Sequence, residues 1–237
     1  MALYAIGDLH LSYGGQKSMD RFGHAWVDHE ARIRRNWIRK ITAEDTVMIL
    51  GDLSWAKSLE EAGPDFDYVL SLPGRKIMLR GNHDMFWNAK KTAKLQNAFG
   101  EQILFLQNNY YEYVNAAGVR YALVGTKGYT WEGKDTLDHA EKLVERETER
   151  LRLSFDAAKE AGLTHFLCFL HYPPTNIYEK DSAFTRMAEA YGAEQVVYAH
   201  CHGTLRFHDS IRGMYHGIRY SLASADCLRM DPMLVME

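Results

Sequence analysis

The sequence predicts an α/β protein, in which short buried strands alternate with longer amphipathic helices. Two observations support this prediction. Short apolar runs recur along the chain, and each ends abruptly at Gly, Asp, Asn or His, as buried strands do. Between them lie longer segments whose apolar residues recur at helical spacing. The 237 residues contain no stretch with the composition of a linker, so we expect a single domain, residues 1–237.

The predicted strands and helices follow one another along most of the chain. The strands are Leu3 to Ile6, Val47 to Leu50, Ile77 to Leu79, Tyr121 to Val124, Phe166 to Leu170 and Val196 to Tyr198. The helices are His24 to Ile41, Leu59 to Leu72, Lys90 to Phe99, Thr136 to Ala161 and Ala183 to Tyr191. The helix from Thr136 to Ala161 has the clearest apolar stripe, and Gly162 provides its stop signal.

The last third of the chain has a different pattern. Leu205 to Ile211 and Met214 to Leu222 alternate between apolar and polar residues, and they flank the dipeptide Arg212-Gly213. This pattern predicts a β-hairpin. We therefore expect a second, more antiparallel sheet in this region.

Composition and charge exclude several classes of protein. Hydrophobic residues make up 46% and charged residues 25% of the chain, as in ordinary globular proteins. The formal net charge is -3 and no basic stripe is present, so we expect no stable binding to duplex nucleic acid. The opening residues 1–8 have neither a charged segment nor an apolar run of the kind found in signal peptides, and no apolar run has membrane-spanning length, so we expect neither secretion nor membrane insertion. Three cysteines without zinc or redox spacing favour a reducing compartment, and we expect a cytoplasmic protein.

Residues of the types that bind metal ions follow five of the predicted strands. In α/β sheets ligands collect outside the carboxyl ends of strands, so we expect these side chains to lie together. A lone His at a strand end is usually structural, but a set of carboxylates and imidazoles buried without a cation would be costly. The sequence therefore predicts two divalent metal ions. The residues concerned are Asp8 and His10, then Asp52, then Asn82, His83 and Asp84, then His171, and finally His200 and His202.

These residues occur in motifs that resemble those of the calcineurin-like metallophosphoesterase superfamily. The resemblance extends from Asp8 to His202 and implies a four-layer α/β/β/α sandwich with two mixed sheets. It also implies two bound metal ions, which Asp52 would bridge. Nitrogen and oxygen donors without thiolate suit Mn, Fe or Zn. By the resemblance, one metal would be held by Asp8, His10 and His202, and the other by Asn82, His171 and His200.

The resemblance further implies a phosphatase or phosphodiesterase whose nucleophile is a hydroxide that bridges the two metals. His83 would be the general acid for the leaving oxygen, and Asp84 would orient His83. Arg80 stands where phosphoprotein phosphatases have an Arg that contacts phosphate, although a structural ion pair is an alternative. We expect Gly81 to be required by a tight turn.

Two departures from the superfamily pattern limit this interpretation. Trp55 replaces an acid that many relatives have after the Gly-Asp motif, and the Arg that often follows is absent. This weakens the likeness to protein phosphatases in how substrate is handled. Ala199 replaces the Gly of the last motif, and we expect a small residue to fit the same place. Cys201 should face away from its neighbouring histidines because side chains alternate along a strand.

Several alternatives stay open at the level of the sequence. Trp55, Trp87, Trp131 and Tyr172 could line the substrate cleft and stack on a base or an aromatic leaving group, or they could be packed inside. Residues 12–28 could form a loop over the site. The substrate could be that of a dinucleoside polyphosphate hydrolase, a nuclease or a serine/threonine protein phosphatase. A non-catalytic scaffold is disfavoured because every predicted ligand and His83 are present.

Overall fold

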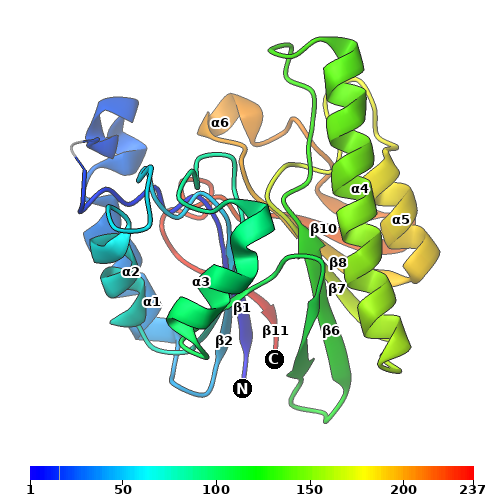
Figure 1. Cartoon of the computed structure of the whole chain (residues 1–237), viewed down its shortest axis with the longest axis horizontal. Helices are drawn as coiled ribbons and strands as arrows, with labels where there is room; N and C mark the ends of the chain where they lie inside the picture. The colour runs from blue at the N-terminus through cyan, green and yellow to red at the C-terminus, as the bar shows by residue number, and fades with distance from the viewer. Residues whose placement is uncertain (16) are drawn as a thin grey trace.

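The computed structural model of the chain describes residues 1–15 and 17–237. Within these residues the strands form two mixed sheets (Figure 1). The first sheet has the spatial order β11 (Met233–Met236), β1 (Leu3–Ile6), β2 (Thr46–Leu50), β3 (Arg75–Leu79) and β4 (Ile103–Phe105). The second has the order β5 (Tyr110–Val114), β6 (Arg120–Thr126), β7 (His165–Leu170), β8 (Ala193–Tyr198), β10 (Ile218–Leu222) and β9 (Gly213–Tyr215).

In each sheet the inner strands are parallel and the edges include antiparallel strands. β1 to β4 run parallel, and β11 pairs antiparallel with β1. β6, β7, β8 and β10 run parallel, while β5 and β9 pair antiparallel at the two edges. The parallel strands of each sheet therefore end at one common edge.

Helices cover the outer face of each sheet (Figure 1). Beside the first sheet lie α1 (His29–Lys40), α2 (Gly63–Leu70) and α3 (Thr92–Phe99), and beside the second lie α4 (Leu137–Glu160) and α5 (Ala183–Tyr191). The short helix α6 (Gly203–Arg206) follows β8, and single 3-10 turns occur at Met19–Phe22, His24–Trp26 and Ala89–Lys91. Among the described residues, no helix combines the length and the apolar character needed to cross a membrane.

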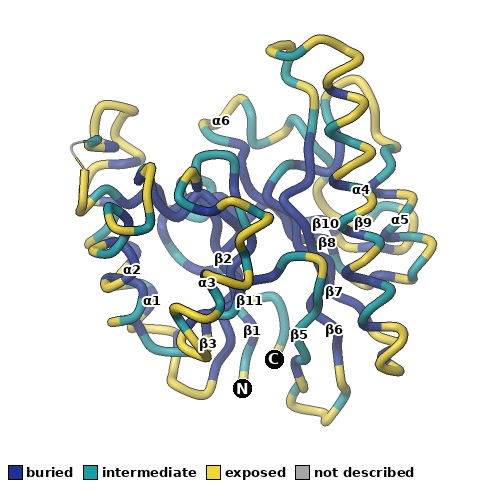
Figure 2. The backbone as a smooth tube through the Cα atoms, in the orientation of Figure 1, coloured by how far each residue is buried: buried dark blue, intermediate teal, exposed yellow. Residues whose placement is uncertain are grey.

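The apolar residues are divided among three packed layers, because side chains alternate between the faces of a strand. Val47 and Ile49 face the helices of the first sheet, whereas Met48 and Leu50 face the second sheet. In the second sheet Cys168 faces the helices, and its neighbour Phe169 faces the first sheet. Figure 2 shows this buried interior between the exposed helices. The predicted four-layer α/β/β/α sandwich with two mixed sheets is confirmed.

The six predicted strands are all present, and most of them are a few residues longer than predicted. The helix predicted from His24 begins only at His29, because Asp28 has a left-handed backbone (φ 51°) that interrupts the helix. The helix predicted from Leu59 to Leu72 is shorter and has Pro64 in its first turn. Strands β4, β5 and β11 were not predicted from their apolar pattern.

The hairpin predicted around Arg212-Gly213 is wrong. Residues 203–206 form α6, and the observed hairpin joins β9 to β10 through His216 and Gly217. Both turn residues have positive φ (48° and 79°), the combination that tight hairpin turns require. Nor does this region form a separate sheet, because β10 pairs in parallel with β8 and extends the second sheet.

Candidate metal centre

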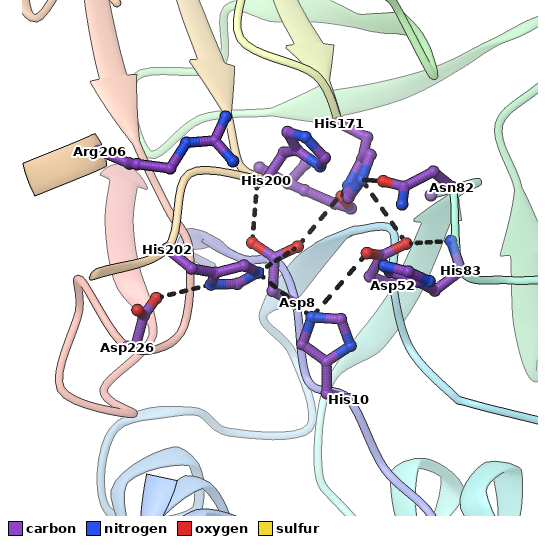
Figure 3. Close-up of polar contacts among 12 residues, drawn as sticks. Asp8, His10, Asp52, Asn82, His83, His171, His200, His202, Arg206 and Asp226 are labelled. Carbon is purple, nitrogen blue, oxygen red and sulfur yellow. Dashed lines mark hydrogen bonds and ion pairs between the residues drawn. The ribbon is translucent and has the colours of Figure 1, made fainter. Parts of the chain in front are cut away.

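The carboxyl ends of β1, β2, β3, β7 and β8 meet at one edge of the sandwich and bring the predicted metal ligands together (Figure 3). The two sheets approach closely at this edge. The Gly7 amide donates to Ala223 O at 2.7 Å, and a Cβ at Gly7 would lie only 2.5 Å from the Cβ of Ala199. Ala199, the residue that replaces Gly in the last motif, therefore fits because Gly7 opposite has no side chain.

One set of donors, which we call the first donor group, consists of Asp8, His10 and His202. Their ligand atoms lie within 4.8 Å of one another. His10 Nε2 and His202 Nε2 are 3.2 Å apart, and Asp8 Oδ1 is 3.7 Å from His202 Nε2. Figure 3 shows these side chains converging from the loop after β1 and from the loop after β8. The arrangement can hold one cation with two nitrogens and one oxygen.

The second donor group consists of Asn82, His171 and His200. The amide oxygen of Asn82 lies 2.7 Å from His171 Nε2, and the ligand atoms of His171 and His200 lie within 4.8 Å of a carboxylate oxygen of Asp52. The other ring nitrogen of His171, Nδ1, is bonded to the Leu50 carbonyl at 2.8 Å. This bond fixes the ring so that Nε2 faces the group.

Asp52 lies between the two donor groups and turns one oxygen toward each (Figure 3). Its Oδ2 is 3.9 Å from His10 Nε2, and its Oδ1 is 3.6 Å from His171 Nε2. The side chain is almost fully buried. Asp52 therefore has the position that a bridging carboxylate needs.

The chemistry of this cluster fits metal ions. Asp8 Oδ1 is buried and has no hydrogen-bond partner among the described residues. Burial raises the pKa of Asp52, with the neighbouring Asp84 and Asp8 adding to the effect, and burial lowers the pKa of His10 and His171. Each of these charged forms is costly here without a cation, and neutral imidazoles beside carboxylates are the donor set of Mn, Fe and Zn sites. The residues present therefore fit a pair of such metals.

Backbone strain is concentrated at the same residues. Asp8, His10, Asp52 and His200 all have positive φ, at 60°, 47°, 51° and 70°. Such conformations cost about 1–3 kcal/mol each in residues other than Gly, and they persist only where the surroundings impose them. Here the loops hold one another: His10 N donates to Asp52 O at 2.9 Å, and His200 N donates to Asp8 Oδ2 at 2.9 Å.

Asp84 has a role different from the predicted one. Its carboxylate accepts hydrogen bonds from the backbone amides of Gly81, Asp52 and Leu53 at 2.7 to 2.9 Å. No bond between this carboxylate and the His83 ring is present in the described part of the chain, so the expectation that Asp84 orients His83 is wrong. Burial raises the pKa of Asp84 to about 6, although the amide bonds oppose this. Asp84 ties the loop after β2 to the loop after β3.

Gly81 is required for a reason other than the predicted turn. Its φ is not among the positive values of this chain. Instead, a Cβ at Gly81 would lie 2.0 Å from Asp52 Oδ1 and 2.2 Å from the Asp52 amide nitrogen. A side chain there would displace the carboxylate that faces both donor groups.

His83 and Arg80 differ in their access to the site. His83 lines a cavity of 340 Å³ together with Asp52 and Asn82, and its backbone amide donates to Asp52 Oδ1 at 2.7 Å. Burial lowers the pKa of His83 to about 4, with Lys17 adding to the effect. Arg80 is not among the residues that line this cavity, and its Nε donates weakly to Gly81 O at 3.4 Å. Its contact with phosphate stays a prediction.

Two carboxylates that were not predicted from the sequence bond to ring nitrogens of His202 and His200. Asp226 Oδ1 is 3.0 Å from His202 Nδ1, and Glu132 Oε1 is 3.0 Å from His200 Nε2. Burial disfavours the charged form of His202, yet Asp8 and Asp226 outweigh this and raise its pKa. The hydrogen bond with His200 is the main cause that lowers the pKa of Glu132 far below its usual range. Carboxylates in this position orient ligand imidazoles and raise their basicity.

A signal for both carboxylates was present in the sequence. Asp226 follows β10 and Glu132 follows β6, so each comes after a strand end, as the predicted ligands do. Arg206, which forms an ion pair with Glu132, was assigned to a strand but lies on α6.

The aromatic residues singled out from the sequence occupy different positions relative to the site. Trp87 is buried and packs on Phe105, so it does not line a cleft. Trp55 stacks on His10 with ring centroids 4.7 Å apart and also packs on His83. Tyr172 lines the cavity and lies 4.2 Å from His200. Trp131 lies farther out, at a neighbouring cavity.

Residues 12–28, predicted as a loop over the site, contain two 3-10 turns and bring side chains to the first donor group. Trp26 packs edge-on against His10 and His202, at 5.6 and 5.3 Å. Lys17 Nζ lies over the Trp55 ring, and Met19 Sδ accepts from Trp55 Nε1 at 3.3 Å. Gln16 lies outside the described residues. Cys201 is buried among the apolar residues of the second sheet and faces away from the donors, as expected.

Comparison with known proteins finds similarity in family pattern, in sequence and in fold. A family model described as calcineurin-like phosphoesterase matches residues 1–203. The Gene 66 protein of Mycobacterium phage D29 is 32% identical over 97 residues, 39% of this chain and 47% of that protein. The corresponding protein of Mycobacterium phage L5 is 29% identical over 77 residues, 32% of this chain and 37% of that protein. The chain thus spans less than half the length of these relatives.

Solved structures share the fold at low sequence identity. Phosphopantetheinyl hydrolase from Mycobacterium tuberculosis is 15% identical, with a TM-score of 0.54, and the match covers 99% of this chain and 95% of that one. Protein TT1561 of Thermus thermophilus is 11% identical, with a TM-score of 0.51 and coverage of 84% and 81%. At such identities the likeness concerns the fold alone.

Proposed function

This chain belongs to the calcineurin-like phosphoesterase family, and from that membership and the geometry of the site we propose that it is a metal-dependent hydrolase of phosphoester bonds. The observation that carries the proposal is the position of Asp52, which turns one carboxylate oxygen toward each of the two donor groups. A single carboxylate placed in this way suits a pair of metal ions rather than one.

Each donor group would hold one metal ion. The first donor group, with Asp8, His10 and His202, would hold one, and the second, with Asn82, His171 and His200, would hold the other. Metal ions held there would supply Lewis acidity toward the phosphoryl oxygens and activate water for attack on phosphorus. The donor set suits Mn, Fe or Zn.

The side chains of the chain itself would position the substrate and move protons. His83 lines the cavity beside Asp52 and Asn82, where a ring nitrogen can hand a proton to the leaving oxygen. Its pKa of about 4 in the free protein keeps the ring neutral near pH 7. The negative charge of a bound phosphoester would raise that pKa and favour the protonated ring. His83 would thus become an acid when substrate is present.

The remaining polar residues would hold this arrangement in place. Asp84 positions Asp52 by binding its backbone amide, while Asp226 and Glu132 orient His202 and His200. Arg80 would contribute to phosphate binding only if its guanidinium reached the cavity that it does not line in the structure. We retain it as a candidate contact to phosphate.

The alternatives within the family differ in substrate. A monoesterase, a diesterase such as a nuclease, a dinucleoside polyphosphate hydrolase and a protein phosphatase would all use this ligand set. Trp55, which stands in place of a common acid, packs on both His10 and His83 and so makes the wall of the site apolar there. This favours a substrate other than that of the protein phosphatases.

The test is hydrolysis of p-nitrophenyl phosphate and bis(p-nitrophenyl) phosphate in the presence of Mn, Fe, Co, Zn or Mg. We expect one metal to support turnover and Asp52→Asn to lower it by at least about a thousandfold, because both metals lose a ligand. His83→Ala should lower kcat by about 100-fold or more. His165→Ala is the matched control, since this exposed histidine lies at the opposite end of β7. Full activity in Asp52→Asn would refute the proposal.

A further inference from the structure

A second cavity adjoins the candidate metal centre. It has a volume of 410 Å³, next to the 340 Å³ cavity that Asp52, Asn82 and His83 line. The two cavities share Thr130, Glu132, Lys134 and Arg206 as lining residues, so they adjoin each other along these side chains. Each part has the size of an ordinary small-molecule site. We call the second cavity the outer cleft.

The outer cleft lies between two loops that follow neighbouring strands. Trp131 belongs to the connection between β6 and α4, and Ile177 and Tyr178 belong to the connection between β7 and α5. Figure 1 shows the first of these connections and α6 rising on the same side of the molecule. Thr130 Oγ1 donates to Pro173 O and ties the two loops together.

The walls of the outer cleft present apolar surface to solvent. Trp131 is 41% exposed, Ile177 66% and Tyr178 81%. The indole of Trp131 is held in place because its Nε1 donates to Asp135 O at 2.9 Å. Among the tryptophans of the described residues this is the exposed one, and it lines the outer cleft and a further neighbouring cavity. Exposed apolar side chains that gather in one cleft, as these three do, are typical of a binding surface.

Several polar groups along the cleft are engaged with one another. Thr175 Oγ1 bonds to Ser210 Oγ at 2.8 Å, and Asn176 Oδ1 accepts from the Tyr178 and Glu179 amides at 2.8 and 3.0 Å. At the boundary with the metal centre, Glu132 pairs with both Arg206 and Lys134. Part of the polar surface of the wall is thus already paired, and a planar ring needs only an aromatic face to bind.

From this arrangement we infer that the outer cleft binds the organic group of the phosphoester, and that this group is a planar aromatic one such as a nucleobase, stacked on Trp131. The inference rests on the proposed phosphoesterase activity and names its class of substrate. The phosphoryl group would lie at the metal centre, and the base would lie beyond the Glu132–Arg206 pair.

The test compares adenosine 5′-monophosphate with ribose 5-phosphate as inhibitors of the metal-loaded full chain acting on whichever p-nitrophenyl ester it hydrolyses. The two compounds share the phosphoryl group and the sugar and differ by the base. We expect the nucleotide to bind more tightly by a factor of about ten or more, as stacking on one aromatic side chain provides. Trp131→Ala should abolish this difference, and Trp131→Phe should keep most of it.

Matched controls separate stacking from a general loss of structure. Leu205→Ala removes an aliphatic side chain that is 89% exposed on α6 and lines neither cavity, so the difference should persist. Ile177→Ala, which changes the wall itself, should reduce it. Inhibition by inorganic phosphate should be the same in all of these variants, since the metal centre is unchanged.

The inference is overturned if the two compounds inhibit equally, or if Trp131→Ala leaves their difference unchanged. Stronger inhibition by a phosphoserine peptide that does not depend on Trp131 would also overturn it, in favour of a protein substrate. If no ester is hydrolysed with any metal, the proposed function fails instead. The same two compounds are then compared by calorimetry, and a base preference that Trp131→Ala removes would preserve the cleft as a binding site.

Discussion

The two donor groups of the metal centre are held in place by different physical means. In the first, the His10 ring is packed between Trp55 and Trp26, and His202 is oriented by Asp226, which is itself buried. In the second, His200 is oriented by Glu132, which lies in the connection between β6 and α4 and also pairs with Arg206. Packing in the interior fixes one group, and an ion-paired loop fixes part of the other.

This difference indicates how the site would respond to its surroundings. The loop that carries Glu132 also carries Trp131, so it contacts both the second donor group and the outer cleft. A ligand in the outer cleft can therefore affect the second donor group through Glu132, whereas the His10 ring of the first is packed against Trp26 and Trp55. We expect the first donor group to bind its metal more tightly than the second.

A change to the loop that both donor groups share should affect both of them alike. Asp84→Ala leaves the buried amides of Gly81, Asp52 and Leu53 without their acceptor. Since each unsatisfied buried donor costs about 1–3 kcal/mol, the free energy of unfolding should fall by about 3 kcal/mol or more. Both metal affinities should weaken together. Urea denaturation measures the first effect and competition with a chelator the second. Unchanged stability would show that Asp84 does not tie the loops.

Asp226→Ala should weaken the first donor group selectively. Removal of a carboxylate that orients a ligand imidazole lowers metal affinity by about 10–100-fold, and the upper part of this range applies because Asp226 is buried. One of the two metals should then be lost at a lower chelator concentration than in the unchanged chain. Asp67→Asn, on the exposed face of α2, is a control that should leave both affinities unaltered. Equal weakening of both metals would contradict the assignment.

Glu132→Gln should weaken metal binding at the second donor group. The loss should be smaller than the loss that Asp226→Ala causes at the first. The glutamine keeps the length of the side chain and a hydrogen bond to His200, but it loses the charge that pairs with Arg206 and Lys134. We expect a loss of about tenfold in the affinity of the second metal, at the lower end of the range for such residues. The first metal should be retained. A chelator titration with two resolved transitions distinguishes this result from that of Asp226→Ala.

Trp55→Leu should have the smallest effect. The stacked contact with His10 would be replaced by an aliphatic one, and aromatic pairs contribute about 0.5–1.5 kcal/mol beyond the area that they bury. The affinity of the first metal should fall by no more than about tenfold. A loss confined to the second metal would show that the packing of His10 has been misassigned.

The sequence predicted the parts of the structure that depend on local pattern. Short apolar runs identified the strands that end at the centre, and the residues that follow them gave the donor set, because the carboxyl ends of parallel strands meet at one edge. The role of Asp84 was not predicted, since two of the amides that it binds come from the loop after β2, about 30 residues earlier. Asp226 and Glu132 were missed because their partners lie far away in the sequence.

Local conformation explains the other errors. Because Asp28 has a left-handed backbone, α1 begins later than predicted, at His29. The hairpin turn lies at His216-Gly217 and not at the predicted position. Neither feature can be detected from the pattern of apolar residues. The reason for Gly81 could not be predicted from local pattern either. A side chain at this position is excluded because Asp52 approaches it closely, and not because of the backbone angle φ of Gly81 itself. Features that depend on contacts between distant segments thus cannot be predicted from the periodicity of apolar residues.

Anomalous scattering from crystals of the manganese-loaded protein tests the central claim most directly. We predict two manganese peaks, one on each side of Asp52, with the first within bonding distance of Asp8, His10 and His202, and the second within bonding distance of Asn82, His171 and His200. A single peak at this edge of the sandwich, or none, would contradict the assignment of a two-metal centre bridged by Asp52.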